Sequence, residues 1–310
     1  MDRIVVIANP TASQFTGGAH REVMSLFRKV ATVDPLWPET AAAARSRAAE
    51  AAEAGADVVV AMGGDGIVHH VAQGLVGSDT PLAIIPVGTT NVIARLLGVP
   101  SKPSRAARLI DGENMSIRQV GTARMTLQRG ATETTHHAVF ACGFGLDAVV
   151  VLEADKDPYR KYRFGSLHYA RTALGVALRD YPRRKPHVMV DIEGRHELVS
   201  AALIQFRSVY TFFGSIPLRV APEQPEPMTV LTIGRLRRKR IPRIVTTLFR
   251  HGDLGTIPEW TVTRHVKSLE LTADPPVAAQ ADGESLGMVD GARIEWAPDS
   301  LRVVVPQRPA

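Results

Sequence analysis

The chain has 310 residues, of which 45% are hydrophobic and 22% charged, a composition that suits one large or two medium globular domains. Its single cysteine, Cys142, excludes an internal disulfide and favours a reducing cytoplasm, and no apolar run reaches the roughly 18 residues of a membrane span. The net charge of +6 comes from one short segment, and the 5% of aromatic residues do not interleave with it, which excludes a nucleic-acid surface.

The first third of the chain alternates predicted strands and helices. Short apolar runs predict buried strands at 3–8, 57–62 and 82–87. Helical patterning predicts helices at 20–31, 40–54 and 67–76. Thr40 is placed to cap the second of these helices. The βαβα order predicts an α/β domain with a doubly wound, mostly parallel sheet.

Beyond about residue 120 the pattern changes to short alternating segments, which predict an antiparallel, β-rich sandwich. The predicted strands are 123–128, 136–142, 186–193, 197–206, 228–233, 260–264, 267–272 and 292–296. Apolar residues at helical spacing predict one helix at 165–181, and prolines predict loops at 217–227 and 275–276.

The most informative motif is Gly63-Gly64-Asp65-Gly66, which follows the predicted strand at 57–62. Glycines allow the backbone to approach an anion, and the N–H groups of the turn and of the following helix can donate to phosphate oxygens. The carboxylate of Asp65 lies where it can hold the cation that accompanies the phosphates. A second loop, Gly88-Thr89-Thr90-Asn91, follows the next strand at the same sheet edge, so a nucleotide site is favoured over a plain turn.

With these motifs the chain resembles the diacylglycerol kinase catalytic family, which includes bacterial lipid kinases and the ceramide and sphingosine kinases and is related to the NAD kinases. The matching segments lie in the family's order over nearly the whole chain. They are Ala8-Asn9-Pro10, Thr40, Gly63-Gly64-Asp65-Gly66, Pro86-Val87-Gly88-Thr89-Thr90-Asn91, Ala94-Arg95, Leu97-Gly98, Gly143-Phe144-Gly145-Leu146-Asp147-Ala148 and Asp282-Gly283-Glu284. The resemblance implies a nucleotide-binding domain at 1–120, to which 299–310 returns, a lipid-binding domain at 121–298, and ATP between the two.

The resemblance also implies the residues of the active site. Glu284 would be the general base that takes the proton of the lipid hydroxyl, and Asp65 would act through Mg²⁺, with Glu226 as a weaker candidate ligand. ATP would be bound by residues of the polar loops and their surroundings, namely Asn9, Thr40, Gly63, Gly64, Asp65, Gly66, Ile67, His69, Gly88, Thr89 and Asn91.

Several positions depart from the family pattern. A threonine, an asparagine and a glutamate usually follow the glycine-rich turn, where this chain has Ile67, His69 and His70. Val92 and Gln119 stand where the family carries aspartates. These departures predict either a different arrangement of the metal site or a protein that binds nucleotide or lipid without catalysing phosphoryl transfer.

The excess positive charge lies in an acid-free segment. Its members are Arg235, Arg237, Arg238, Lys239, Arg240 and Arg243. Apolar residues at helical spacing follow at 241–249, which predicts a helix that either packs on the core with a solvated basic end or docks on an anionic membrane. A kinase of neutral lipids needs such a surface, so we predict a cytoplasmic protein that is peripheral on the inner face of the membrane.

Other functions are weighed against this reading. Residues 283–287 fit G-x-S-x-G, but no histidine follows Ser285, as a serine hydrolase requires. Residues 143–148 fit G-x-G-x-x-A without the later acid of a dinucleotide fold, and no P-loop motif is present. NAD kinase, a non-catalytic protein of the same fold, and a kinase of another amphiphile such as a sphingoid base remain open.

Overall fold

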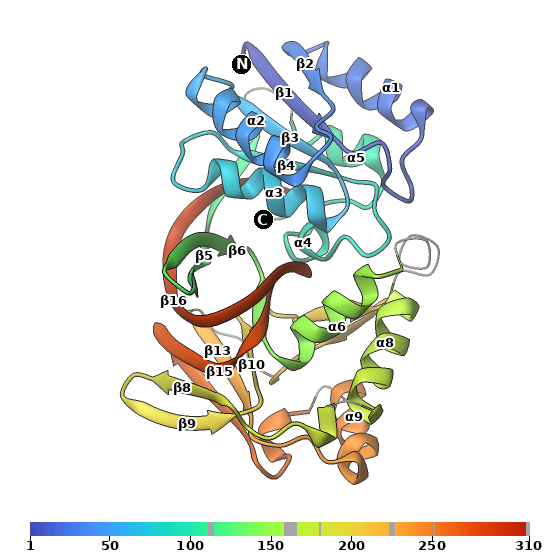
Figure 1. The fold of residues 1–310 in the computed structure, drawn as a ribbon. Helices are drawn as coiled ribbons and strands as arrows, with labels where there is room; N and C mark the ends of the chain where they lie inside the picture. Colours follow the sequence, from blue (N-terminus) through green and yellow to red (C-terminus); the bar gives the residue numbers. More distant parts are fainter. Residues whose placement is uncertain (111–114, 158–165, 180, 223–226, 251, 308–310) are drawn as a thin grey trace. The chain divides into compact units, whose positions relative to one another are not determined.

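The computed structural model describes residues 1–110, 115–157, 166–179, 181–222, 227–250 and 252–307 (Figure 1). The chain forms two compact units. Unit 1 comprises Met1–Gly121 and Pro298–Ala310, and unit 2 comprises Thr122–Ala297. These limits lie one residue from those of the predicted domains.

Unit 1 contains a parallel sheet in the order β2-β1-β3-β4-β16. Its strands are β1 (Arg3–Ala8), β2 (Thr32–Leu36), β3 (Val58–Gly63), β4 (Leu82–Pro86) and the last residues of β16 (Glu284–Val305). Strands β3 and β4 are buried along their whole length, as their continuous apolar sequences predict. The doubly wound, mostly parallel class predicted from the βαβα order is confirmed.

In the described residues of unit 1, five helices accompany this sheet. They are α1 (Gly17–Phe27), α2 (Ala41–Glu53), α3 (Asp65–Leu75), α4 (Val92–Leu96) and α5 (Pro103–Ala107). Helix α2 packs against α3, and α1 packs against α5 (Figure 1). Since β1 lies between β2 and β3, the chain builds the sheet outward in two directions from the β1–β3 pair. Ligands of doubly wound sheets bind at the carboxyl ends of the strands beside such a point.

Unit 2 is rich in antiparallel strands, in the order β14-β13-β10-β7-β15-β16. These are β7 (Ala141–Phe144), β10 (Ala201–Gln205), β13 (Met228–Ile233), β14 (Trp260–Val266), β15 (Ser268–Ala281) and the first part of β16. Further pairs are β5 (Ser116–Arg129) with β6 (Thr132–Ala138), β8 (Val188–Ile192) with β9 (Arg195–Val199), and β11 (Thr211–Phe213) with β12 (Ile216–Leu218). The predicted antiparallel, β-rich class is confirmed.

The helices of unit 2 are α6 (Leu146–Asp155), α8 (Ser166–Arg179) and α9 (Ile241–Phe249), with single 3₁₀ turns at Tyr181–Arg183, Arg238–Arg240 and Leu254–Thr256. Helix α6 packs against α8. In the described part of the chain no helix is both long enough and apolar enough to cross a membrane.

The structure differs from the predicted elements in several places, among them helices α4 and α5 and strands β11 and β12, which were not predicted. Strand β2 was not predicted because it contains Pro35, which an edge strand tolerates. Helix α1 begins and ends earlier than predicted, because the hydroxyl of Thr16 caps it at Ala19. Pro275 and Pro276 lie inside β15, where the register with β16 shifts, and not in a loop. Helix α6 was also not predicted.

Candidate active site

Three loops of unit 1 meet at the carboxyl ends of β1, β3 and β4. The N–H of Asn9 donates to the carbonyl of Met62 at 2.9 Å, and the N–H of Val87 donates to the carbonyl of Gly63 at 3.0 Å. Gln14 donates to the carbonyl of Val87 at 2.9 Å, which ties the first loop to the third. The sheet therefore brings together the two glycine-rich loops that the sequence analysis placed at one edge, and it adds to them the loop that follows β1.

Glycines let two of these loops touch through their backbones. A Cβ atom on Gly88 would lie 2.5 Å from the Cα of Gly64, and one on Gly63 would lie 2.2 Å from the Cγ2 of Ile67. Both distances are shorter than real contacts allow, so a side chain at Gly88 would push the two loops apart and one at Gly63 would displace Ile67. The packing alone requires these glycines, and no side chain caps the start of α3 at Gly64.

Asp65 stands at the start of α3, where a carboxylate is stabilised by the helix dipole. Its Oδ1 accepts the N–H of Ile93 in the first turn of α4 at 3.0 Å. Burial lowers the pKa of Arg95, and the charge of Asp65 opposes that shift. Asp65 thus braces α4 with one oxygen and has the guanidinium of Arg95 nearby. A magnesium ion bound here would share the carboxylate of Asp65 with these two partners.

Asn91 closes the third loop. Its backbone is left-handed, with φ of 49°, and its side-chain amide donates to the carbonyl of Gly88 at 2.7 Å while Oδ1 accepts the N–H of Gly88 at 3.0 Å. Between them Thr89 is exposed, with its hydroxyl 2.8 Å from that of Ser13. The loop is therefore held in shape by Asn91 and presents hydroxyl groups at the sheet edge.

The other residues that were predicted to bind ATP have contacts within unit 1 instead of open side chains. The hydroxyl of Thr40 accepts the N–H of Ala43 at 3.1 Å, so it acts as the N-cap of α2. Ile67 is only 9% exposed and His69 1%, so both side chains belong to the packed face of α3. Contact of ATP with these two residues stays a prediction, and it would require the side chains to move outward.

The donor set for magnesium is sparse. No group of three or more His, Cys, Asp or Glu residues in the described ranges could hold a metal ion, and Glu226 lies outside those ranges. Val92, at a position where the resemblance implies an acid, is buried at the start of α4, and Gln119 is exposed on β5. Mg²⁺ commonly binds through one carboxylate, water and substrate phosphates, and Asp65 fits only this mode.

In unit 2, the turn Asp282-Gly283-Glu284 connects β15 with β16. Asp282 has a left-handed φ of 53°, is 3% exposed, and accepts the N–H groups of Val139, Phe140 and Ala141 at 2.7, 2.9 and 3.3 Å. Glu284 is half-buried and opens β16 opposite Ala281. Sequence reasoning gave Asp282 no role of its own, and the Asp-Gly-Glu motif was the only signal that pointed to it.

Replacing Asp282 with alanine should lower the free energy of unfolding by about 3 kcal/mol or more, because three buried N–H groups lose a charged acceptor. Urea denaturation of the variant and the wild type would measure this difference. Asp290→Ala is the matched control, since Asp290 is exposed and accepts the N–H of Gly130 alone, and its loss should change stability by about 1 kcal/mol or less. Equal effects of the two substitutions would contradict the bracing role.

Comparison with known proteins matches this arrangement to one class of enzyme. The family described as "Diacylglycerol kinase catalytic domain" matches residues 3–123. A diacylglycerol kinase of Mycobacterium tuberculosis is 27% identical over 98% of this chain and 96% of its own length.

Solved structures share the fold. A diacylglycerol kinase from Bacillus anthracis has a TM-score of 0.69 at 17% identity, with 98% of this chain and 97% of the other covered. Yeast NADH kinase in complex with NADH has a TM-score of 0.51 at 10% identity, covering 99% of this chain and 84% of the other. At these identities the likeness concerns the fold alone.

Glycine-rich loops at the switch point of a parallel sheet, followed by a strand-rich unit, form the fold of the diacylglycerol kinase and NADH kinase structures. Residues 3–123 match the diacylglycerol kinase catalytic domain, and the chain is a lipid kinase.

Proposed function

We propose that the protein transfers the γ-phosphate of ATP to a hydroxyl group of a neutral lipid, either diacylglycerol or a ceramide-type lipid, at an anionic membrane surface. The observation that carries this proposal is the convergence of the Gly63–Gly66 turn and the Gly88–Asn91 loop on one sheet edge in a chain that matches this catalytic domain. The backbone N–H groups and hydroxyls gathered there suit a triphosphate.

Charge neutralisation and positioning do most of the work in phosphoryl transfer. Asp65 would hold the Mg²⁺ that arrives with ATP, and the ion would neutralise charge on the phosphates. The guanidinium of Arg95, near Asp65, adds positive charge to the same edge. Glu284 would accept the proton of the lipid hydroxyl, and Asp282 would hold the turn from which Glu284 projects.

Two other functions have support of their own. The shared fold of yeast NADH kinase keeps a nicotinamide dinucleotide open as the phosphate acceptor. The buried Val92 and the exposed Gln119, at positions where the resemblance implies acids, favour a protein that binds nucleotide and lipid without turnover. Neither observation outweighs the match to the diacylglycerol kinase catalytic domain.

A single assay separates these functions. Purified protein would be given γ-³²P-labelled ATP and Mg²⁺ with diacylglycerol, ceramide, sphingosine or NAD in mixed anionic micelles. Label in one lipid is expected, and its identity names the substrate. Label in NAD would overturn the lipid assignment, and ATP binding with no label in any acceptor would establish the binding-only function.

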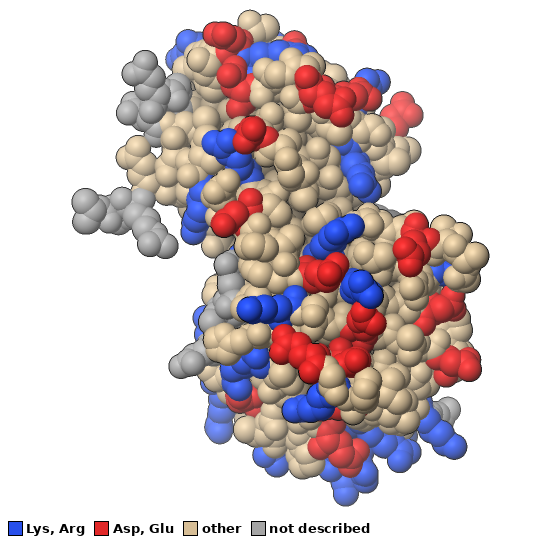
Figure 2. All heavy atoms as spheres, turned by 90° about the vertical axis from the view of Figure 1, so that its left-hand side faces the viewer, with Lys and Arg blue, Asp and Glu red and all other residues tan. Residues whose placement is uncertain are grey.

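Helix α9 supplies the surface that we propose for membrane docking. Ile241 and Ile244 are buried against unit 2, whereas Val245 and Phe249 are 41% and 43% exposed. Side chains of Lys and Arg gather at the end of unit 2 where α9 lies (Figure 2). An exposed apolar strip beside a cationic surface is the pattern of a helix that lies in the membrane interface.

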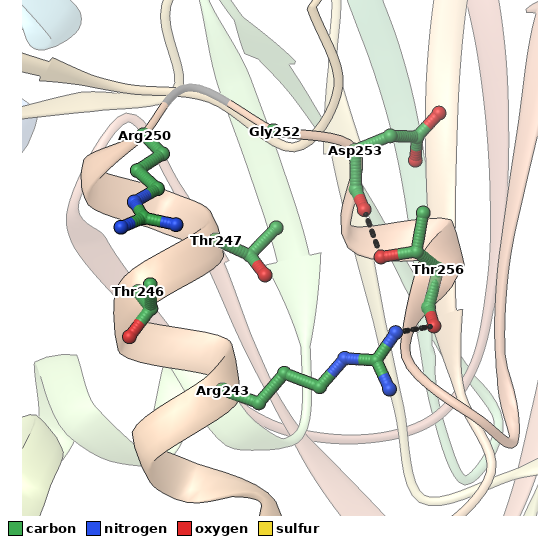
Figure 3. A pocket seen from close by; sticks show the side chains of 7 residues that line it. All are labelled: Arg243, Thr246, Thr247, Arg250, Gly252, Asp253 and Thr256. Atoms are coloured by element: carbon green, nitrogen blue, oxygen red, sulfur yellow. Dashed lines mark hydrogen bonds between the residues drawn. The ribbon is translucent and has the colours of Figure 1, made fainter.

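The polar face of α9 is hollowed. Arg243, Thr246, Thr247 and Arg250 recur at helical spacing along the face. With Gly252, Asp253 and Thr256 they line a hollow of about 440 Å³ (Figure 3). Arg243 also donates to the carbonyl of Thr256 at 2.9 Å. This face could receive an anionic headgroup.

Part of the basic segment is engaged within unit 2. Arg237 and Arg240 contact the carboxylate of Glu259 at 2.6 and 3.5 Å, and Arg238 donates to the carbonyl of Leu178 at 2.7 Å. The cationic surface that we propose includes the exposed side chains of Arg235, Lys239 and Arg243. The bond from Arg243 to the carbonyl of Thr256 does not cancel the charge of its guanidinium.

The double variant Lys239→Glu/Arg243→Glu should bind phosphatidylglycerol vesicles roughly 10- to 100-fold more weakly than the wild type, because each basic residue near such a surface contributes about 1 kcal/mol. Vesicle co-sedimentation at low and high salt would measure the partition. Lys102→Glu/Arg105→Glu, which makes the same charge change in unit 1, should keep the wild-type affinity. An equal loss in both variants would show that net charge, and not α9, governs binding.

A further inference from the structure

We propose that Asp147, Tyr210 and Gln280 form a partly buried positioning network that fixes the turn carrying Glu284, so that Gln280 is a positioning residue for phosphoryl transfer. This inference rests on the proposed function, in which Glu284 is the base. It concerns residues of unit 2 only, and it assigns a role to the segment 143–148 that the sequence analysis left unexplained.

Gln280 has its amide oriented by two polar partners. Its Nε2 donates to Oδ2 of Asp147 at 2.7 Å and lies 3.1 Å from the hydroxyl of Tyr210, which itself donates to the same Oδ2. A carboxylate accepts and cannot donate, so Asp147 selects the orientation in which the NH₂ group faces it. In that orientation Oε1 accepts the N–H of Gly283 at 2.9 Å.

The turn is therefore held at two successive residues. Asp282 is anchored to the backbone that leads into β7, and Gly283 is anchored to Gln280. Glu284 follows at once, so a change in either anchor would move its carboxylate. A displacement of about 1 Å at a reacting group can lower a rate a hundredfold.

Room for the Asp147 carboxylate is made by glycine. A Cβ atom on Gly143 would lie 2.0 Å from Oδ2 of Asp147, and one on Gly145, with φ of 87°, would lie 2.4 Å from the hydroxyl of Tyr181. The spacing Gly143-x-Gly145-x-Asp147 thus places an acid against β7 and β15. The two glycines of this segment make room for the network and do not indicate a dinucleotide site.

Asp147 is poorly suited to a purely stabilising role. Burial raises the pKa of Asp147, against the opposing effect of the bonds from Tyr210 and Gln280. Its buried Oδ1 has no hydrogen-bond partner of good geometry among the described residues, and no ion pair in those residues includes it. A carboxylate with a buried oxygen and no cation beside it costs folding free energy, which favours a functional reason for its presence.

The titratable groups around Asp147 come from several elements. Cys142 lies on β7, Tyr181 on the 3₁₀ turn after α8, and Tyr210 just before β11. Burial is the main cause of a raised pKa in all three, and the charge of Asp147 adds to it. None of them is a base that could take the proton of Asp147. A second carboxylate placed beside Asp147, at position 280, would therefore share a proton with Asp147 alone, and this provides a test of the network.

The test compares Gln280→Leu with Gln280→Glu in lipid phosphorylation. Gln280→Leu should lower kcat roughly 10- to 100-fold at every pH while KM for ATP stays unchanged, because the nucleotide loops lie in unit 1. The kcat of Gln280→Glu should equal that of Gln280→Leu near pH 9. As the pH falls to about 6 it should rise above that of Gln280→Leu, because one proton shared by the two carboxyl groups restores the bond to Asp147. The ratio of the two variants cancels the titration of Glu284.

Gln128 provides the matched control. Its Nε2 also donates to a carboxylate, that of Glu133 at 3.1 Å, but on the exposed β5–β6 hairpin. Gln128→Leu and Gln128→Glu should leave kcat and its pH profile unchanged. Tyr210→Phe, which removes one hydroxyl, is expected to lower kcat less than Gln280→Leu does. It provides the test of the network if Gln280→Leu does not fold.

Wild-type kcat in Gln280→Leu, or a Gln280→Glu to Gln280→Leu ratio that does not change with pH, would overturn the network. A rise in KM for ATP equal to the fall in kcat would also overturn it, as that would indicate general loss of structure. If the wild type phosphorylates no lipid, the proposed function itself fails, and this result is distinct from an active wild type with unaffected variants.

Discussion

Glu284→Gln is expected to phosphorylate lipid roughly 10²- to 10⁴-fold more slowly than the wild type, the usual contribution of a general base. Glutamine keeps the size and half-buried position of the side chain but cannot take a proton. The affinity for ATP should not change, because the proposed phosphate loops belong to unit 1. Initial rates with labelled ATP and calorimetric titration with ATP would measure the two quantities.

The control is Glu295→Gln, on the same strand β16 and equally half-buried, which should retain the wild-type rate. The pH profile adds a second criterion, since loss of the base should remove the fall in kcat on the acid side of the wild-type profile. A Glu284→Gln enzyme with full activity would exclude this residue as the base, and the search would turn to other acids of unit 2.

Gly88→Ala is expected to weaken ATP binding by roughly tenfold or more and to lower the free energy of unfolding by about 1–3 kcal/mol. The new methyl group would lie 2.5 Å from the Cα of Gly64, so the two phosphate loops would have to separate. ATP titration and urea denaturation of the same preparation would give both values.

Gly74→Ala separates the loss of ATP affinity from the loss of stability. Its methyl group would lie 2.4 Å from the carbonyl oxygen of Arg45 and 2.8 Å from Cβ of Ala48, between α2 and α3 and away from the loops. It should destabilise unit 1 to a similar extent while ATP affinity is kept. Gly18→Ala, whose methyl group would make only an ordinary contact of 4.0 Å with Oγ1 of Thr16 at the start of α1, should change neither property. Equal losses of ATP affinity in Gly74→Ala and Gly88→Ala would show that the loops have no special part in binding.

The parts of the fold that could be predicted are those set by local sequence. Continuous apolar runs identified β1, β3 and β4, and the glycine-rich turns placed the loops at their carboxyl ends. The cap of α2 at Thr40 was also readable, because it depends on a contact only three residues away. Strand β2 was missed because an edge strand need not be apolar and can contain proline.

Long-range contacts explain what the sequence did not show. The bond between Gln280 and Asp147 joins residues 133 positions apart, and the bond between Asp282 and Val139 joins residues 143 apart. Such pairs depend on the register of β7 against β15, which no local pattern encodes. The lengths of β15 and β16 were underestimated for a related reason, since a shift in register interrupts the alternation of each strand.

Strand β16 has a consequence for how the protein is made. It opens with Glu284 in unit 2 and ends in unit 1, where Val303 lies beside Leu82 of β4. During translation the ribosome must complete residues 122–297 before the part of β16 that pairs with β4 exists, which takes roughly 9–35 s at about 5–20 residues per second. Until then the apolar β4 is an uncovered edge, open to chaperones and to misassociation. The nascent chain therefore completes the parallel sheet of unit 1 only after its proposed base has been synthesised.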